Sequence, residues 1–177
     1  MGIVGNLQVP IAAIVEWVGD MFQELSNDDS APRAVQLGIR ADIPTSGPVS
    51  RVTGRLADLC DSGDIDEYTV RTWPARVRFD VDPHDSAVVD LYQRFWAWAD
   101  AHGWSIRPAF DIRQGQTMLG EHEQLLLTPV IFAWVVDDDE IVALAPVSVD
   151  GRTYTVDELL TALESTETRS PPERVSA

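Results

Sequence analysis

The chain has 177 residues, and 29 acidic side chains against 13 basic ones give it a formal net charge of −16. This length is enough for one domain with a substantial core and short extensions. Its single cysteine, Cys60, excludes an internal disulfide.

All 13 basic residues are arginine, and the chain contains no lysine. An acidic, lysine-free composition with ordinary core hydrophobicity is typical of proteins from a cytoplasm rich in salt. At about 1 M salt the Debye length is only about 3 Å, so the repulsion among carboxylates is largely screened. The composition therefore predicts a cytoplasmic protein of a halophile. An acidic protein from a GC-rich genome, which also favours arginine codons, is the alternative.

The first 33 residues predict an apolar helix followed by a linker. Apolar side chains recur at helical spacing from Ile11 to Leu25. No basic residue precedes them, which argues against a signal peptide, and two acids near the centre argue against a membrane span. Residues 6–25 are expected to dock on the domain, to bind a protein partner or mediate self-association as a homodimer, or to contact a membrane surface. A structural or assembly role of this helix is one hypothesis.

Residues 34–165 predict a single domain, and residues 166–177 a disordered tail. The expected order begins with a strand over 35–41, a helix over 48–62 that Gly63 ends, and a strand over 65–73, which residues 75–81 extend or pair with. A helix from Pro83 to Gly103 follows, then an edge strand over 104–112 and a loop over 113–123.

The remaining elements are mainly extended. The apolar run 124–136 is expected to be buried, and residues 141–149 run back beside it. Asp150-Gly151 predicts a hairpin turn, and Thr155 with Glu158 predicts a capping box at the last helix. The predicted fold is α+β, with a mixed, mainly antiparallel sheet, helices packed mostly on one face, and the N-terminal apolar helix in addition.

The stretch "GRLADLCDSGDIDEYTVRTW", residues 54–73, fits two interpretations. It resembles the end of a winged helix-turn-helix, in which Ser50, Arg51, Thr53 and Arg55 would contact DNA bases or phosphates. It equally fits a helix and a strand of an α/β layer. A helix-turn-helix needs a supporting helix directly before the recognition helix, whereas the alternation over 35–41 favours a strand.

Residues 34–165 resemble a group of small haloarchaeal proteins that are labelled helix-turn-helix domain proteins. The resemblance is carried by "RLADLCDSGDIDEYTVRTW", "FWAWADAHGWSIRPAFDIR", "LLLTPVIFAWVVDDDEIVALAPVS" and "TYTVDELLTAL". None of these is a catalytic motif. The label implies transcriptional regulation, with DNA as a possible partner.

No phosphate-binding glycine loop, nucleophile motif or zinc-type spacing is present, so no cofactor and no metal is expected. These features predict a non-catalytic regulatory or interaction protein. The alternative is a small anion-binding protein or small enzyme that uses Arg107, Asp111, Arg113 and His122. Arg107, Asp111 and Arg113 would share one face of a regular strand, and arginine forms paired hydrogen bonds with carboxylate and phosphate. An internal salt-bridge network is the competing explanation.

Transfer of the protein from molar to millimolar KCl is expected to lower its midpoint of thermal unfolding. The reason is that repulsion within a chain of net charge −16 is no longer screened in dilute salt. Circular dichroism melts at both salt concentrations measure this effect. An unchanged midpoint would contradict the halophile interpretation.

Overall fold

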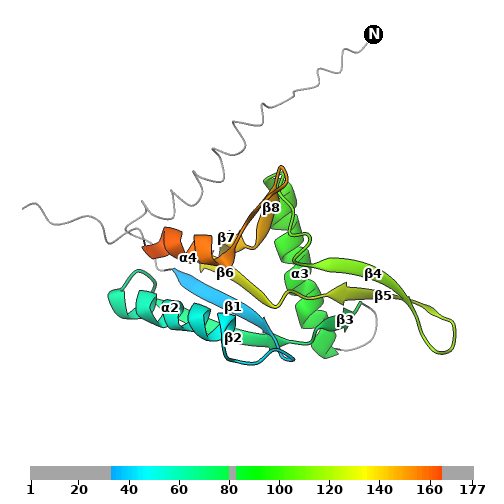
Figure 1. The fold of residues 1–177 in the computed structure, drawn as a ribbon. Helices are drawn as coiled ribbons and strands as arrows, with labels where there is room; N and C mark the ends of the chain where they lie inside the picture. Colours follow the sequence, from blue (N-terminus) through cyan, green and yellow to red (C-terminus); the bar gives the residue numbers. More distant parts are fainter. Residues whose placement is uncertain (1–32, 80–82, 165–177) are drawn as a thin grey trace, which may run out of the picture.

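A computed structural model of the chain describes residues 33–79 and 83–164 (Figure 1). In chain order the elements are β1 (Ala34–Arg40), α2 (Pro48–Ser62), β2 (Glu67–Trp73), β3 (Arg76–Arg78), α3 (Pro83–Ala101), β4 (Asp111–Gln116), β5 (His122–Leu127), β6 (Ile131–Asp137), β7 (Glu140–Ala145), β8 (Val147–Val149), β9 (Arg152–Tyr154) and α4 (Val156–Glu164). The predicted N-terminal helix and the predicted tail lie outside the described residues.

The strands form three sheets instead of the single sheet that we expected. The largest has the order β2-β1-β6-β7, and the others are β3-β5-β4 and β8-β9. Strands β1 and β2 are parallel, as the strand–helix–strand unit requires, while every other pair in these sheets is antiparallel. The α+β class with mixed and antiparallel sheets is therefore confirmed.

The four-stranded sheet is covered on both faces. Helices α2 and α4 pack on one face, against the buried side chains of β1, β6 and β7. Helix α3 and the three-stranded sheet pack on the opposite face (Figure 1). The expectation that helices lie mostly on one face thus holds for α2 and α4, but α3 completes a second core on the other face.

Strand β1 separates these two cores. Its alternate residues Val35, Leu37 and Ile39 are buried beneath α2 and α4, as the sequence alternation predicts. On the other face, Gly38 lies directly under the ring of Trp73. The Trp73 indole donates a buried hydrogen bond to the Pro129 carbonyl at 3.0 Å and stacks on Trp134. A side chain at position 38 would occupy the space that this ring fills.

Residues 104–123 differ from the sequence prediction. The expected strand over 104–112 is mainly a turn, and the expected loop over 113–123 is the β4–β5 hairpin, which extends away from the body of the domain (Figure 1). Trp104, Ile106 and Phe110 are all buried, so their apolar spacing reflects burial of a turn and not a strand. The hairpin is mostly solvent-exposed and polar, which removes the period-two signal by which strands are recognised.

The apolar run 124–136 is divided between two sheets. Strand β5 pairs with β3 and β4, whereas β6 pairs with β1 and β7. The break falls at Thr128 and Pro129, where the Thr128 N–H donates to the Ala75 carbonyl. Strand β3 accordingly pairs with β5, and the prediction that it extends or pairs with β2 is wrong.

Local signals elsewhere predicted the structure correctly. Helix α2 spans Pro48–Ser62 and ends at Gly63, which has the expected left-handed conformation. Asp150 and Gly151 both have positive φ in the β8–β9 turn. Among the described helices, none is both long enough and apolar enough to cross a lipid bilayer.

Replacement of Gly38 by alanine is expected to destabilise the domain by about 3 kcal/mol, because the new Cβ would overlap the Trp73 ring. Gly54, on the exposed side of α2, is the matched control, because a methyl group added there would meet no neighbouring atom within 4 Å. Gly54→Ala should stabilise the domain by about 1 kcal/mol through helix propensity. Chemical denaturation at constant molar salt measures both, and equal effects of the two substitutions would contradict this role of Gly38.

Candidate nucleic-acid interface on helix α2

Of the four residues of helix α2 predicted to contact DNA, two lie on its exposed side and two border its buried stripe. Val49, Val52, Leu56 and Leu59 are buried against the sheet. Ser50 and Arg51 are exposed, whereas Thr53 and Arg55 are half-buried. The geometry around each side chain decides whether it is available to a nucleic acid.

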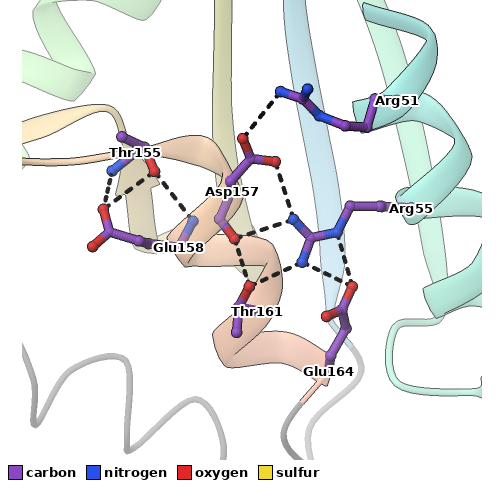
Figure 2. Close-up of polar contacts among 7 residues, drawn as sticks. All are labelled: Arg51, Arg55, Thr155, Asp157, Glu158, Thr161 and Glu164. Carbon is purple, nitrogen blue, oxygen red and sulfur yellow. Dashed lines mark hydrogen bonds and ion pairs between the residues drawn. The ribbon is translucent and has the colours of Figure 1, made fainter. Parts of the chain in front are cut away.

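Arg55 is directed at helix α4 instead of solvent (Figure 2). Its Nε donates to the Glu164 carboxylate at 2.9 Å, its Nη1 to the Asp157 carboxylate at 3.0 Å, and its Nη2 to the Thr161 hydroxyl at 3.0 Å. Only 23% of the side chain is exposed. All three nitrogens of the guanidinium thus have partners within the domain, and a phosphate would have to displace carboxylates from it.

Arg51 shares the same carboxylate but is held more loosely. Its Nη2 donates to the other Asp157 oxygen at 3.3 Å, and 61% of its side chain is exposed. Asp157 therefore bridges the two arginines (Figure 2). The Thr53 hydroxyl donates to the Val49 carbonyl of its own helix at 3.0 Å. Ser50 and Arg51 are thus the two accessible members of the predicted set.

Helix α4 holds its side of this network through its own N-terminal cap. The predicted capping box is present: the Thr155 N–H donates to Glu158 at 2.8 Å, and the Glu158 N–H donates to the Thr155 hydroxyl. Burial alone would raise the pKa of the Glu158 carboxyl. The hydrogen bonds from Thr155 and from the Arg152 guanidinium lower it by more, so the pKa lies below its ordinary value. The carboxylate therefore stays charged and keeps the first turn of α4 in place at neutral pH.

The partners on α4 were missed by reasoning from the sequence, although a signal for them exists. Asp157, Thr161 and Glu164 have the spacing i, i+4, i+7, which places them on one face of a helix. They form a polar stripe in a helix whose other face is leucine-rich and buried. Such a stripe beside an arginine-bearing helix indicates an interhelical salt-bridge network, which we name the α2–α4 network.

The segment before α2 lacks the supporting helix of a helix-turn-helix. The extended backbone predicted over 35–41 is confirmed as β1, hydrogen-bonded to β2 and β6. Residues 41–47 connect β1 to α2 without a helix. The structure therefore places α2 in a parallel strand–helix–strand unit and not second in a helix pair.

The helices also lack a basic surface. Among the side chains that the structure describes, α2 exposes Asp58 and Asp61 beside Arg51, and α3 exposes Asp90 and Asp100 beside Arg94. Helix α4 contains no basic residue. Phosphate contacts require positive charge, and none of these three faces has a positive balance.

The alternative site, for an anion, is only partly assembled. A pocket of about 590 Å³ at the end of β1 is lined by Asp111 and Arg113, together with Arg40 and Thr128, but not by Arg107 or His122. His122 lies further along the hairpin, opposite Gln116. Both arginines already have a carboxylate partner: Arg113 donates to Asp111 at 3.2 Å, and Arg40 forms two 3.0 Å bonds to Asp42.

The hydrogen bonds from Arg40 hold the pKa of Asp42 below its ordinary range.

Within the described part of the chain, no group of three or more histidine, cysteine, aspartate or glutamate side chains is arranged to hold a metal ion. Cys60 is a free, half-buried thiol whose Sγ lies 3.4 Å from the Asp66 carbonyl.

Comparison with known protein families gives one match. The model of a family described as "Helix-turn-helix domain" matches residues 27–168. The chain belongs to this helix-turn-helix domain family. No curated protein and no solved structure matches it. Membership in this family is compatible with a DNA-binding regulator, and it confirms the label that the sequence resemblance carried.

In this member of the helix-turn-helix domain family, Arg55→Ala is expected to lower the free energy of unfolding by about 1–2 kcal/mol. Its loss removes several charge-assisted hydrogen bonds within the α2–α4 network. Arg51→Ala is the matched control: it removes one exposed ion pair and should cost about 0–1 kcal/mol. Urea denaturation of both variants at one salt concentration measures the difference. Equal effects would show that Arg55 is no more important to the fold than a surface arginine.

Proposed function

We propose that this protein is a cytoplasmic regulatory protein of a halophilic archaeon that acts through protein contacts, and that its described domain does not read DNA through α2. The observation that carries the proposal is the position of Arg55, whose guanidinium is held by Asp157, Thr161 and Glu164 of α4. A recognition helix presents its arginines outward. Here Arg55 instead joins two helices of one core.

Electrostatics favour the same function. Binding to a phosphate backbone gains free energy from the release of counterions, and this gain falls steeply as salt rises. A chain of net charge −16 in a salt-rich cytoplasm gains little from that source and must also bring its own carboxylates near the phosphates. Contacts with proteins depend on apolar burial and hydrogen bonds, so their binding free energy falls much less at high salt.

Regulation remains part of the proposal because of the family to which the chain belongs. A regulator can associate with chromatin through a protein partner without reading bases itself. Direct contact of Ser50, Arg51, Thr53 and Arg55 with DNA, which the sequence suggested, is the alternative to this proposal. The absence of catalysis and a role of residues 6–25 in binding a partner stay predictions. Binding by the purified protein, compared with crosslinking in cells, separates direct from indirect association.

A second candidate function is the binding of a small anion in the pocket at the end of β1. Its volume, about 590 Å³, lies in the range of small-molecule sites. Asp111 and Arg113 both line it, as expected if they act together, but Arg107 does not. A carboxylate or phosphate would compete with Asp42 and Asp111 for the two arginines. We therefore place this function second.

The expected result at native salt is that the purified protein does not bind duplex DNA, whereas the protein in cells is crosslinked to chromatin through a partner. Fluorescence anisotropy with genomic fragments measures the first, and genome-wide crosslinking of a tagged protein measures the second. Arg51→Glu reverses the accessible charge of α2 and should leave the crosslinking pattern unchanged. Arg152→Glu, on β9, is a matched charge reversal on another element.

Two outcomes would contradict the proposal. Binding of purified protein to DNA that Arg51→Glu abolishes and Arg152→Glu does not would assign direct readout to α2. Absence of any enriched locus in cells would remove the regulatory role on DNA.

A further inference from the structure

Strand β2 has an open hydrogen-bonding edge. It is the last strand of the four-stranded sheet, and no other segment among residues 33–79 and 83–164 pairs with it. The Trp73 carbonyl accepts from the Ala41 N–H across the β1–β2 pair. Successive residues of a strand direct their backbone groups to opposite edges, so residues two apart share an edge. The backbone groups of Thr69 and Arg71 therefore point toward β1, as those of Trp73 do. The backbone N–H and C=O groups of Tyr68, Val70 and Thr72 therefore point outward.

This edge is neither shortened, nor interrupted by a proline, nor bulged, and these are three of the ways in which proteins prevent strand pairing. Strand β2 has seven residues with no proline within it and no irregularity in its register with β1. The opposite edge strand, β7, is paired through a bulge at Val135/Val136 and runs directly into Pro146. Edge strands are normally shortened, bulged or interrupted in this way. The regular edge of β2 is thus a surface suited to a further strand.

The side chains of β2 are also exposed to an unusual degree. Tyr68 is 36% exposed and Val70 is 42% exposed, and both lie on the sheet face that carries α2. Glu67 and Arg71 lie on the other face, and neither forms a salt bridge within the described residues. The strand therefore presents one apolar pair and one unpaired set of opposite charges, spaced along the same edge.

We propose that two copies of this chain pair through β2, antiparallel, about a two-fold axis at Thr69. In this register Tyr68 faces Val70 of the second copy, and Glu67 faces Arg71 of the second copy. Both pairs occur twice, because the axis relates each strand to the other. The outward backbone groups of Tyr68 and Val70 meet in hydrogen-bonded pairs, so the two four-stranded sheets become continuous.

The charge pattern selects this register over its neighbour. Pairing about Val70 also aligns the outward backbone groups, but it places Glu67 opposite Trp73 and Thr69 opposite Arg71. Both opposite-charge pairs and both Tyr–Val pairs are then lost. Cross-strand pairs of opposite charge, and pairs of an aromatic with a β-branched residue, each favour pairing. The strand is therefore self-complementary about Thr69, which points to a second copy as its occupant.

The pairing goes beyond the proposed function and does not depend on it, because β2 is separate from the exposed face of α2. A protein that fails every DNA or chromatin test would still be expected to pair through this edge. Conversely, a chain that is monomeric could still be a regulator. The two inferences are thus tested by different measurements.

Cysteine scanning of the full chain at molar KCl tests the register. In this register Thr69 is the only residue of β2 that lies opposite the same residue of the second copy. The two Thr69 residues form a non-hydrogen-bonded pair, in which the Cα atoms are about 4.5 Å apart, and a disulfide can span this distance. In a Cys60→Ser background, Thr69→Cys should form an interchain disulfide under mild oxidation. Arg71→Cys, two residues away on the same face, should not. A chain that carries both Glu67→Cys and Arg71→Cys should again form the interchain disulfide, because residue 67 of one copy lies opposite residue 71 of the other.

Sedimentation equilibrium supplies the second readout. The unmodified chain should be a dimer, and Val70→Asp should raise its dissociation constant by about tenfold or more while circular dichroism stays unchanged, because Val70 is already exposed in one copy. A monomer at all concentrations would overturn the proposal. The proposal would also be overturned if the Val70→Asp chain were still a dimer, or if Thr69→Cys formed no interchain disulfide in a dimeric chain. Either result would place self-association elsewhere, for example in residues 6–25.

Discussion

Strand β1 is hydrogen-bonded on both edges, to β2 and β6, and at its centre it is buried on both faces. One face presents Val35, Leu37 and Ile39 to the helices α2 and α4. The other admits the Trp73 ring because residue 38 has no side chain. The two cores of the domain therefore meet at this strand. Its extended conformation also fixes the role of α2, since a helix that follows a central strand packs back onto the sheet.

The α2–α4 network follows from that constraint. Once the apolar stripe of α2 lies on the sheet beside α4, Arg55 is brought to the polar stripe of Asp157, Thr161 and Glu164. In this chain, which has many more acidic than basic residues, six arginines form salt bridges within the described residues. Arg55 thereby becomes part of the structure of the domain, whereas Arg51 stays largely exposed. This is why a recognition-like sequence does not by itself make a DNA-reading surface.

The same sheet that engages β1 on both sides leaves β2 with one edge that no described segment pairs with. The two faces of β2 differ, because Tyr68 and Val70 lie beside α2 while Glu67 and Arg71 lie on the side of the second core. A helix-turn-helix domain family member that is built around a sheet thus has two kinds of surface: helices with acidic exposed faces, and a strand edge with unmet hydrogen bonds. The association through protein contacts that we propose would use the strand edge, because high salt weakens backbone hydrogen bonds and apolar contacts less than it weakens contacts between charges.

The sequence by itself determined the features that depend on neighbours along the chain. The alternation in 35–41, the helix of 48–62 with its terminal Gly63, the Asp150-Gly151 turn and the capping box at Thr155 are local patterns, and each formed as predicted. The tertiary structure alone decided which strands pair, that the apolar run 124–136 is split between two sheets, and that Arg55 meets Glu164, 109 residues away. A local pattern fixes the period and the ends of an element, but it carries no information on which distant element fills the space beside it. Which distant elements pair depends on the packing of the whole core, because alternative partners for one buried surface differ in free energy only when the rest of the core is in place.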